Sequence, residues 1–264
     1  MQPCFFPTSL AHRSSLCALA AVLLAAPLAS AQAAGDWSVS AGGLLAVGPR
    51  FPGSDKTSAI VVPNIQARYK DFLTINPIDG IGVVYSVDDK LQLGASLGLD
   101  LTKRLAKDDS RLKGLADIKE AGALRATAKY RAGPMFGEVK LTSRLGSDEK
   151  RGSLVDMEGG YTLLATRDNW VNVGVALRWM DSSYARNFFG ISPAQSAASG
   201  LKVFNAGSGL QSAGVFVGGY QRLAPDWTGF ARLGVAKLQG DAANSPVTRS
   251  TTQTTLVVGV NYAF

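Results

Sequence analysis

The chain has 264 residues and a formal net charge of +7, and both of its cysteines and its one histidine lie within residues 1–31. If that segment is removed on export, the remaining chain has no thiolate nucleophile, no imidazole base and no soft or imidazole metal ligand. This composition excludes most hydrolase triads, zinc sites and disulfides, and we expect neither an enzyme nor a bound cofactor. For an exported protein, the basic balance indicates anionic lipid or polysaccharide as a partner and not nucleic acid.

Residues 1–31 have the features of a signal peptide. A lone arginine precedes an almost unbroken apolar run at 16–28, and small residues follow it. The alternative is a membrane anchor, but the run is too short to cross roughly 30 Å of hydrocarbon as a helix. We therefore expect cleavage after Ala31, or after Ala33, which leaves 32–264 as one domain.

Beyond the signal peptide, the sequence alternates between apolar and polar residues with period two, which is the pattern of strands. The clearest case is 91–101, where leucine or alanine at odd positions alternates with polar residues or glycine at even positions. No apolar run in this part is long enough for a transmembrane helix, so a membrane location requires a barrel. In chain order, we expect about twelve strands, at 37–46, 58–69, 71–77, 80–87, 91–101, 119–131, 134–145, 153–164, 169–181, 213–222, 227–238 and 252–264.

The connections between these strands alternate in length. The tight turns are at 70–71, 88–90, 132–134, 167–169 and 224–226. The long loops are at 47–57, 102–118, 146–152, 182–212 and 239–251. Outer-membrane barrels have short periplasmic turns and long extracellular loops, and a soluble sandwich has no reason to keep that alternation. Only the link at 78–79 breaks it, and 58–77 can also be read as one bent strand. We predict a closed antiparallel transmembrane β-barrel.

Aromatic residues at the strand ends and the pattern of the last strand support this barrel. Amphipathic rings settle at the membrane interface, and we expect that placement for Trp37, Tyr69, Tyr85, Tyr130, Trp170, Trp179, Tyr220 and Trp227. The final strand alternates out to a terminal aromatic residue, which resembles the assembly signal of outer-membrane barrels, and its members are Leu256, Val258, Val260, Tyr262 and Phe264. The alternative is an ordinary edge strand, but closure removes the aggregation hazard of a long apolar edge.

If the apolar faces meet lipid, the polar faces line the interior of the barrel. A charge on the lipid face would cost roughly 2–4 kcal/mol at mid-membrane, so we place the charged strand residues in the lumen. The candidate lumen residues are Arg125, Lys129, Glu138, Lys140, Arg144, Asp156, Glu158, Arg178 and Arg232. Basic groups are in excess. The lumen is either a narrow, weakly anion-preferring pore or a space filled by its own paired side chains, because twelve strands lie between filled and open barrels.

The motifs without alternation lie in the long loops. They are found at 51–55, 112–118, 188–197 and 240–246. Phe188 and Phe189 would be unfavourable on an exposed loop tip, so we expect them to pack over or into the barrel mouth. For Asp55, Asp117 and Asp241 two interpretations stay open: turn and loop structure, or a hard-cation or ligand site at the mouth. We assign no metal to them.

These four loop segments, in this order and between these strands, resemble the MipA/OmpV family, also called MltA-interacting proteins. The resemblance covers essentially all of the chain after the signal peptide, and its most specific parts are 189–196 and 240–246, although Phe51 stands where tyrosine is expected. The motif residues that carry it are Pro52, Gly53, Ser54, Asp55, Gly114, Asp117, Phe189, Gly190, Pro193, Gln195, Ser196, Gly240, Asp241 and Pro246. It implies a protein of the cell outer membrane.

The resemblance implies two kinds of function. One branch of the family is associated with scaffolding of the murein-synthesising machinery, and other members behave as porin-like, osmotically regulated or adhesion-related proteins. We expect a scaffold linked to peptidoglycan synthesis, with outer-membrane lipid, lipopolysaccharide, a murein hydrolase and a murein synthase as partners. The alternative is a small porin-like channel. The short periplasmic turns weigh against the scaffold, because none offers the roughly 800 Å² per partner of a stable interface.

Overall fold

The computed structural model describes residues 36–147 and 151–264, so the expected signal peptide lies outside the described residues. Its strands form one closed barrel in which each pairs antiparallel with the next, and the last pairs with the first. They are β1 (Trp37–Pro49), β2 (Thr57–Tyr69), β3 (Leu73–Asn76), β4 (Gly80–Ser86), β5 (Leu91–Asp100), β6 (Ala121–Ala132), β7 (Met135–Arg144), β8 (Gly152–Ala165), β9 (Asn169–Met180), β10 (Gly209–Ala224), β11 (Trp227–Leu238) and β12 (Thr252–Ala263). The predicted fold class is confirmed.

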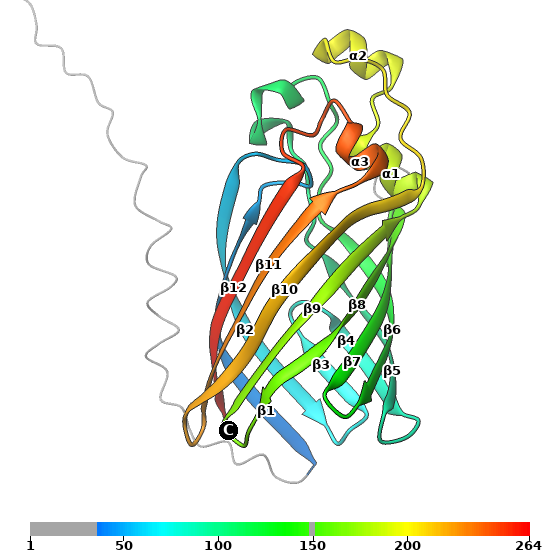
Figure 1. Ribbon diagram of the computed structural model, residues 1–264. Coiled ribbons are helices and arrows are strands. Elements are labelled where there is room, and N and C mark those ends of the chain that lie inside the picture. The colour runs from blue at the N-terminus through cyan, green and yellow to red at the C-terminus, as the bar shows by residue number, and fades with distance from the viewer. Residues whose placement is uncertain (1–35, 148–150) are drawn as a thin grey trace, which may run out of the picture.

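The two ends of the barrel differ as the connection lengths predicted. Figure 1 shows the short turns and the C terminus at one end, and the helices and long loops at the other. In the layout of outer-membrane barrels, the first end is periplasmic and the second is extracellular. The largest difference in strand bounds is that β10 begins at Gly209, within the stretch expected to be a loop.

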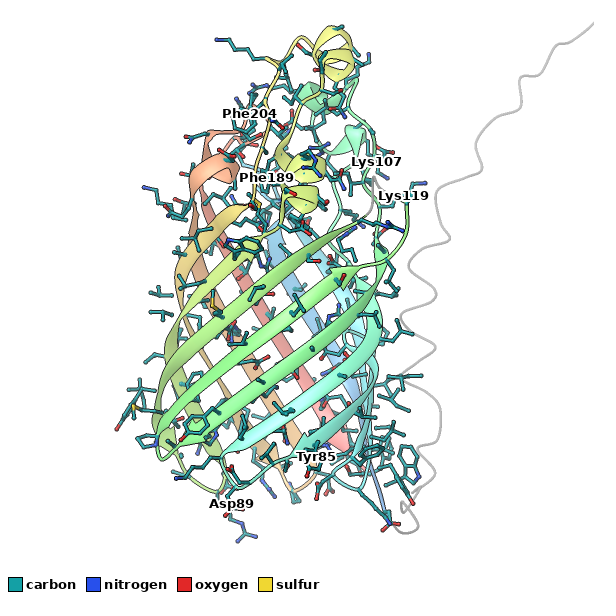
Figure 2. The ribbon with its side chains drawn as sticks, turned by 90° about the vertical axis from the view of Figure 1, so that its right-hand side faces the viewer. Tyr85, Asp89, Lys107, Lys119, Phe189 and Phe204 are labelled. Atoms are coloured by element: carbon teal, nitrogen blue, oxygen red, sulfur yellow. The ribbon has the colours of Figure 1, made fainter. Side chains whose placement is uncertain are left out.

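The outer face of the barrel is an apolar band. Its side chains occupy alternate positions along the strands, as at Leu93, Leu97 and Leu99, which are 41%, 54% and 51% exposed. Further members of the band are Ile81, Val83, Leu124, Val139, Leu141, Val175, Leu177, Val215, Val217, Leu233 and Val235. Figure 2 shows side chains projecting outward along the whole height of the wall. A continuous exposed apolar band is the surface that hydrocarbon covers in an outer-membrane barrel.

The interfacial placement expected for the aromatic residues is correct for only part of the set. Trp37 and Tyr69 form an outward pair near the periplasmic end, with ring centroids 5.0 Å apart. Trp170 and Tyr220 are also paired in register, and their rings stack at 5.8 Å. This second pair points into the lumen, because Trp170 has the parity of the inward residue Arg178. Their assignment to the membrane interface was wrong.

The long loops form a compact extracellular cap. They contain the α-helices α1 (Ser182–Phe189), α2 (Pro193–Ser199) and α3 (Gly240–Asn244) and the 3-10 helices η2 (Ala106–Asp108) and η3 (Ser110–Leu112). Asp181 accepts a hydrogen bond from the backbone N–H of Tyr184 and so caps α1. Ser192 and Gln195 form a capping box at the start of α2, with Pro193 as its first residue. No helix in the described ranges is long and apolar enough to cross a membrane.

The wall has one irregularity, the short hairpin of β3 and β4. Figure 1 shows that this hairpin stops well short of the extracellular end of the barrel. β3 pairs with β2 only at 67–69, and β4 pairs with β5 only at 92–97. The link that broke the predicted alternation of lengths, at 78–79, therefore joins two strands that do not reach the rim.

Candidate functional site in the barrel lumen

The lumen holds two cavities at different heights. The upper one, of about 770 Å³, is lined by the extracellular halves of the strands, including Gly48, Ser58 and Arg178. The lower one, of about 630 Å³, is lined by the periplasmic halves, including Ser38 and Gln92. Together the two cavities extend along most of the barrel interior.

The upper cavity is lined by both apolar side chains and ion pairs. Its apolar side chains are Ala46, Ile60, Phe216, Ala236, Leu238 and Val257. Two ion pairs also line the cavity: Arg178 Nε lies 2.6 Å from Asp156 Oδ1, and an Arg232 nitrogen lies 2.7 Å from Glu158 Oε1. The Arg232 guanidinium also stacks 3.7 Å from the centre of the Phe216 ring. The cavity is therefore amphipathic, with its charges held in fixed positions.

The lower cavity is basic. Its cations are Arg68, Arg125, Lys129 and Lys140, and its carboxylates are Asp79 and Glu138. Lys129 lies 3.5 Å from Glu138, and Arg125 lies 3.9 Å from Asp79. Arg68 and Lys140 have no ion pair within the described ranges. These two cations of the cavity thus make no direct ion pair, although Lys140 stands opposite Asp156 of β8 in the ladder.

The expected lumen residues divide between these two cavities, with one exception. Asp156, Glu158, Arg178 and Arg232 line the upper cavity, whereas Arg125, Lys129, Glu138 and Lys140 line the lower one. Arg144 lines neither. It is 2% exposed and pairs with Asp100 at 2.5 Å beneath the cap. It does face the interior, as expected, but a buried carboxylate and two backbone carbonyls hold its guanidinium beneath the cap and outside both cavities.

The cap closes the extracellular end of the lumen with two apolar clusters. The first contains Phe188 and Phe189, which are 2% and 0% exposed and confirm the expectation that they pack over the barrel mouth. Figure 2 shows Phe189 and Phe204 inside the cap, whereas Tyr85 and Asp89 mark the opposite end. The second cluster is Phe51, Leu112, Leu115, Ile191 and Val247. Residues from loops far apart in the sequence thus form one packed lid.

Arg104 and Tyr184 are the two largest of the buried side chains with a polar group in the cap. Arg104 is 2% exposed and donates to the backbone carbonyl of Phe188 at 2.6 Å. Burial lowers the pKa of Arg104, and the nearby carboxylate of Asp117 raises it in part. Tyr184 is fully buried, its hydroxyl has no hydrogen-bond partner within the described ranges, and burial raises the pKa of the phenol. Tyr184 is packed within the first apolar cluster, and Arg104 is tied to α1 by its hydrogen bond to Phe188.

The aspartates of the loop motifs hold the backbone and side chains of the cap in place. Asp117 accepts from the N–H of Ala106 at 2.7 Å, Asp241 accepts from the N–H of Gly207 at 2.7 Å, and Asp55 lies 3.7 Å from Arg249. Within the described ranges, no group of three potential metal-ligating residues occurs. For these aspartates the structure therefore favours the loop interpretation over the cation site.

The other motif residues shape turns and helix ends. Gly53, Gly114 and Gly240 have positive φ values of 95°, 92° and 49°, which other residues rarely adopt. Ser54 bonds the backbone of Lys56, and Ser196 donates to the carbonyl of Leu201 at 2.6 Å. The remaining motif residues lie beside buried members of the cap or at the ends of α1 and α2, and they are Pro52, Phe189, Gly190, Pro193, Gln195 and Pro246.

Several lumen residues were not found from the sequence. Asn64 donates to the amide oxygen of Asn261 at 3.1 Å, and Arg68 and Asp79 line the lower cavity. The region 58–69 gave no clear face assignment, because apolar residues occupy both of its faces. Asp79 lies in the link at 78–79, which interrupted the regular pattern of turns. That interruption was the one sequence signal for an unusual part of the wall.

The assembly signal forms the closing strand of the barrel. The N–H of Phe264 donates to the carbonyl of Val39 at 3.0 Å, and the Tyr262 ring contacts those of Phe264 and Trp227 at 5.0 and 5.2 Å. The members Leu256, Val258 and Val260 all lie within β12. The role of these residues in assembly stays a prediction.

Comparisons with known proteins identify the family of the chain. No curated protein matches it. Among solved structures, it is similar to OmpT of Vibrio cholerae (9% identity, TM-score 0.37, covering 87% of this chain and 98% of that one). It is also similar to the NanC porin (9% identity, TM-score 0.42, covering 85% and 98%) and to a bacterial polysaccharide outer membrane secretin (10% identity, TM-score 0.45, covering 86% and 97%). The sequence profile described as MltA-interacting protein MipA matches residues 41–264, so the chain belongs to the MipA family of outer-membrane β-barrels.

Proposed function

We propose that this protein is a narrow porin-like passage for small solutes, with a preference for anions. The observation that carries the proposal is the pair of cavities, of about 770 and 630 Å³, at two heights of one lumen. Twelve strands enclose more room than the filled interior of an eight-strand barrel and less than the aqueous channel of a large porin. A lumen of this kind suits small solutes, and the cap limits their access from outside.

The charge of the lumen supports the preference for anions. In the lower cavity the basic side chains outnumber the acidic ones, and Arg68 and Lys140 lack an ion pair within the described ranges. In the upper cavity Arg50, Lys103, Arg178 and Arg232 face Glu120, Asp156 and Glu158. A confined space lined by an excess of one charge concentrates ions of the opposite sign. Small anions should therefore enter more readily than cations of equal size.

Efflux from proteoliposomes tests this proposal. Vesicles with the purified, folded protein should release a small anionic solute severalfold faster than a cation of similar size. The double variant Arg68→Gln, Lys140→Gln should lose most of that difference, because it removes the two cations without an ion pair. Lys70→Gln, in an exposed periplasmic turn, is the matched control and should behave as the wild type. Absence of efflux of either solute above that of protein-free vesicles would contradict the passage.

The family favours a second candidate function, the scaffold of the peptidoglycan-synthesising machinery. The family profile is described by an interaction with MltA and matches nearly all of the described chain. A periplasmic partner would have to contact the short turns at 70–72, 87–90, 133–134, 166–168 and 225–226. Their small area predicts weak binding, because stable complexes bury about 800 Å² per partner. Retention of a murein hydrolase from envelope extract on the immobilised protein would support the scaffold, and no retention would count against it.

A further inference from the structure

Part of β2 is an open edge within the barrel wall. β2 pairs with β1 along its whole length, but β3 covers only 67–69 on its other side. The stretch 57–66 therefore has no strand partner on that side. On the facing side, β4 covers β5 only up to Leu97, so that Gly98–Asp100 pair with β6 but have no strand partner on the β4 side, where the carbonyl of Leu99 accepts a hydrogen bond from Arg125 at 2.6 Å.

Pro63 lies in the middle of this open edge. In the ladder it stands opposite Gly43 of β1, and it has no N–H to donate to that partner. Its backbone groups must therefore face the gap, together with those of the other odd-numbered residues of 57–66, since these groups alternate along a strand. Proline on an exposed edge blocks pairing with a further strand. This edge is therefore unsuited to closure by a second copy or by a peptide.

The gap between residues 57–66 of β2 and the end of β5 is closed above and below. It is therefore a window in the wall, and the barrel is not split along its length. Above it, Lys56 Nζ lies 2.8 Å from Asp109 Oδ2, and Arg50 donates to the carbonyl of Asp108 at 3.3 Å. Below it, the turn between β3 and β4 packs against β5. There Asp79 lies 3.9 Å from Arg125.

The outer rim of the window belongs to the apolar band. On the β2 side, Val61 and Ile65 are 79% and 53% exposed, and on the opposite side Ile81 and Leu99 are 61% and 51% exposed. The window therefore lies at the height of the hydrocarbon. Unpaired backbone groups at that depth are tolerated only where they line a polar or water-filled space.

The upper cavity reaches both sides of the window. Ser58 and Ile60 of β2 line it on one side, and Thr102 and Lys103 line it on the other. Ile60 points inward, because it stands opposite the inward residue Ala46, and yet it is 48% exposed. An apolar side chain this exposed inside a barrel is unfavourable in water and favourable beside an acyl chain.

We propose that this window is a lateral entrance through which an acyl chain of a lipid of the surrounding leaflet occupies the upper cavity. The tail would lie against Ile60 and the other apolar residues that line that cavity, and its anionic head would lie near Arg50, Lys56 and Lys103 at the upper rim. The open backbone edge would face the cavity water and the polar part of the lipid. This inference goes beyond the proposed passage of solutes, and either one can fail without the other.

Pulsed electron paramagnetic resonance tests the window directly. In the chain with Cys4→Ser and Cys17→Ser, a nitroxide label is attached to Ile60→Cys, with Val61→Cys as the outward-facing reference. A label at Thr127→Cys, which lines the lower cavity, is the matched inward control. Each protein is placed in vesicles of phosphatidylcholine and phosphatidylglycerol with perdeuterated acyl chains, and heat-modifiable gel mobility shows that it is folded.

The label at position 60 should show deuterium modulation from the acyl chains, comparable to that at position 61 and severalfold above that at position 127. With ordinary lipids in D₂O, position 127 should show the strongest modulation. Modulation from water alone at position 60 would overturn the proposal. A dipolar distance between labels at position 61 of two molecules would also overturn it, because it would mean that a second copy covers the window.

Discussion

Replacing Arg144 by methionine is expected to destabilise the folded barrel by about 3–5 kcal/mol, the usual cost of removing one partner of a buried ion pair. The guanidinium is 2% exposed and donates to Asp100 and to the carbonyls of Thr102 and Lys119. It also stacks 5.3 Å from the centre of the Phe188 ring. Its loss would leave the carboxylate of Asp100 buried without its cation and would remove the support beneath the cap.

Urea unfolding of the protein in lipid vesicles, followed by tryptophan fluorescence, measures this effect. Lys140→Met is the matched control on the same strand, because it removes an inward cation that has no ion pair within the described ranges. The control should change stability by less than about 1 kcal/mol. The double variant Asp100→Asn, Arg144→Met should recover part of the loss, because it no longer buries an unpaired charge. Equal stability of Arg144→Met and wild type would contradict the pairing.

Replacing Phe189 by alanine is expected to cost about 3–5 kcal/mol, because a fully buried aromatic side chain is removed from a packed cluster. Phe189 is 0% exposed and lies among Tyr184, Phe188 and Leu238. Its backbone carbonyl also accepts a hydrogen bond from Ser245, which ties α1 to the loop after α3. The cap should loosen locally before the barrel unfolds, so protease cleavage within 182–208 should become faster.

Tyr184→Phe is the matched control in the same cluster. It removes a buried hydroxyl that has no hydrogen-bond partner within the described ranges, so stability should stay the same or rise by about 1 kcal/mol. Because burial raises the pKa of this phenol, the unfolded chain ionises first as the pH rises past roughly 10. Wild-type stability should then fall relative to Tyr184→Phe above that pH, and the two should not diverge between pH 7 and 9. A large loss of stability in Tyr184→Phe at pH 7 would contradict this.

The strands could be predicted from the sequence because lipid and lumen impose opposite demands on alternate residues. In β5 this demand is met at every position, and the predicted strand 91–101 differs from the observed one by a single residue. The start of β10 was missed because the register shifts between Leu210 and Ser212, where a bulge interrupts the alternation. The capping box of Ser192 and Gln195 marks the start of α2 in the sequence, but a helix this short inside a long loop gives little periodicity.

The sequence could predict which residues face the lumen, but not which of their side chains form ion pairs with one another. Alternation places Asp100 and Arg144 inside the barrel, but their contact spans β6, where the inward residues are the small Ala121 and Ala123. Arg232 and Glu158 come from β11 and β8 and meet across the interior. Such pairs depend on the register and curvature of several strands together, which one sequence does not contain.

The window could not be predicted from the alternation of apolar and polar residues, and the reason is physical. A strand that faces lipid outside and an apolar cavity inside carries apolar residues on both faces, as 58–65 does. The apolar–polar alternation of β2 is therefore lost in the part of the strand that borders the proposed lipid entrance. Only the irregular link at 78–79 marked this region.

Single-channel conductance of the refolded protein in a planar bilayer tests most directly whether the capped lumen is a passage. The expected result is discrete and reproducible steps, with a reversal potential in a salt gradient that shows a preference for anions. The steps should become larger when Phe189→Ala loosens the cap. If neither the wild type nor Phe189→Ala gives conductance steps, although heat-modifiable gel mobility shows that both are folded, the result would contradict a passage.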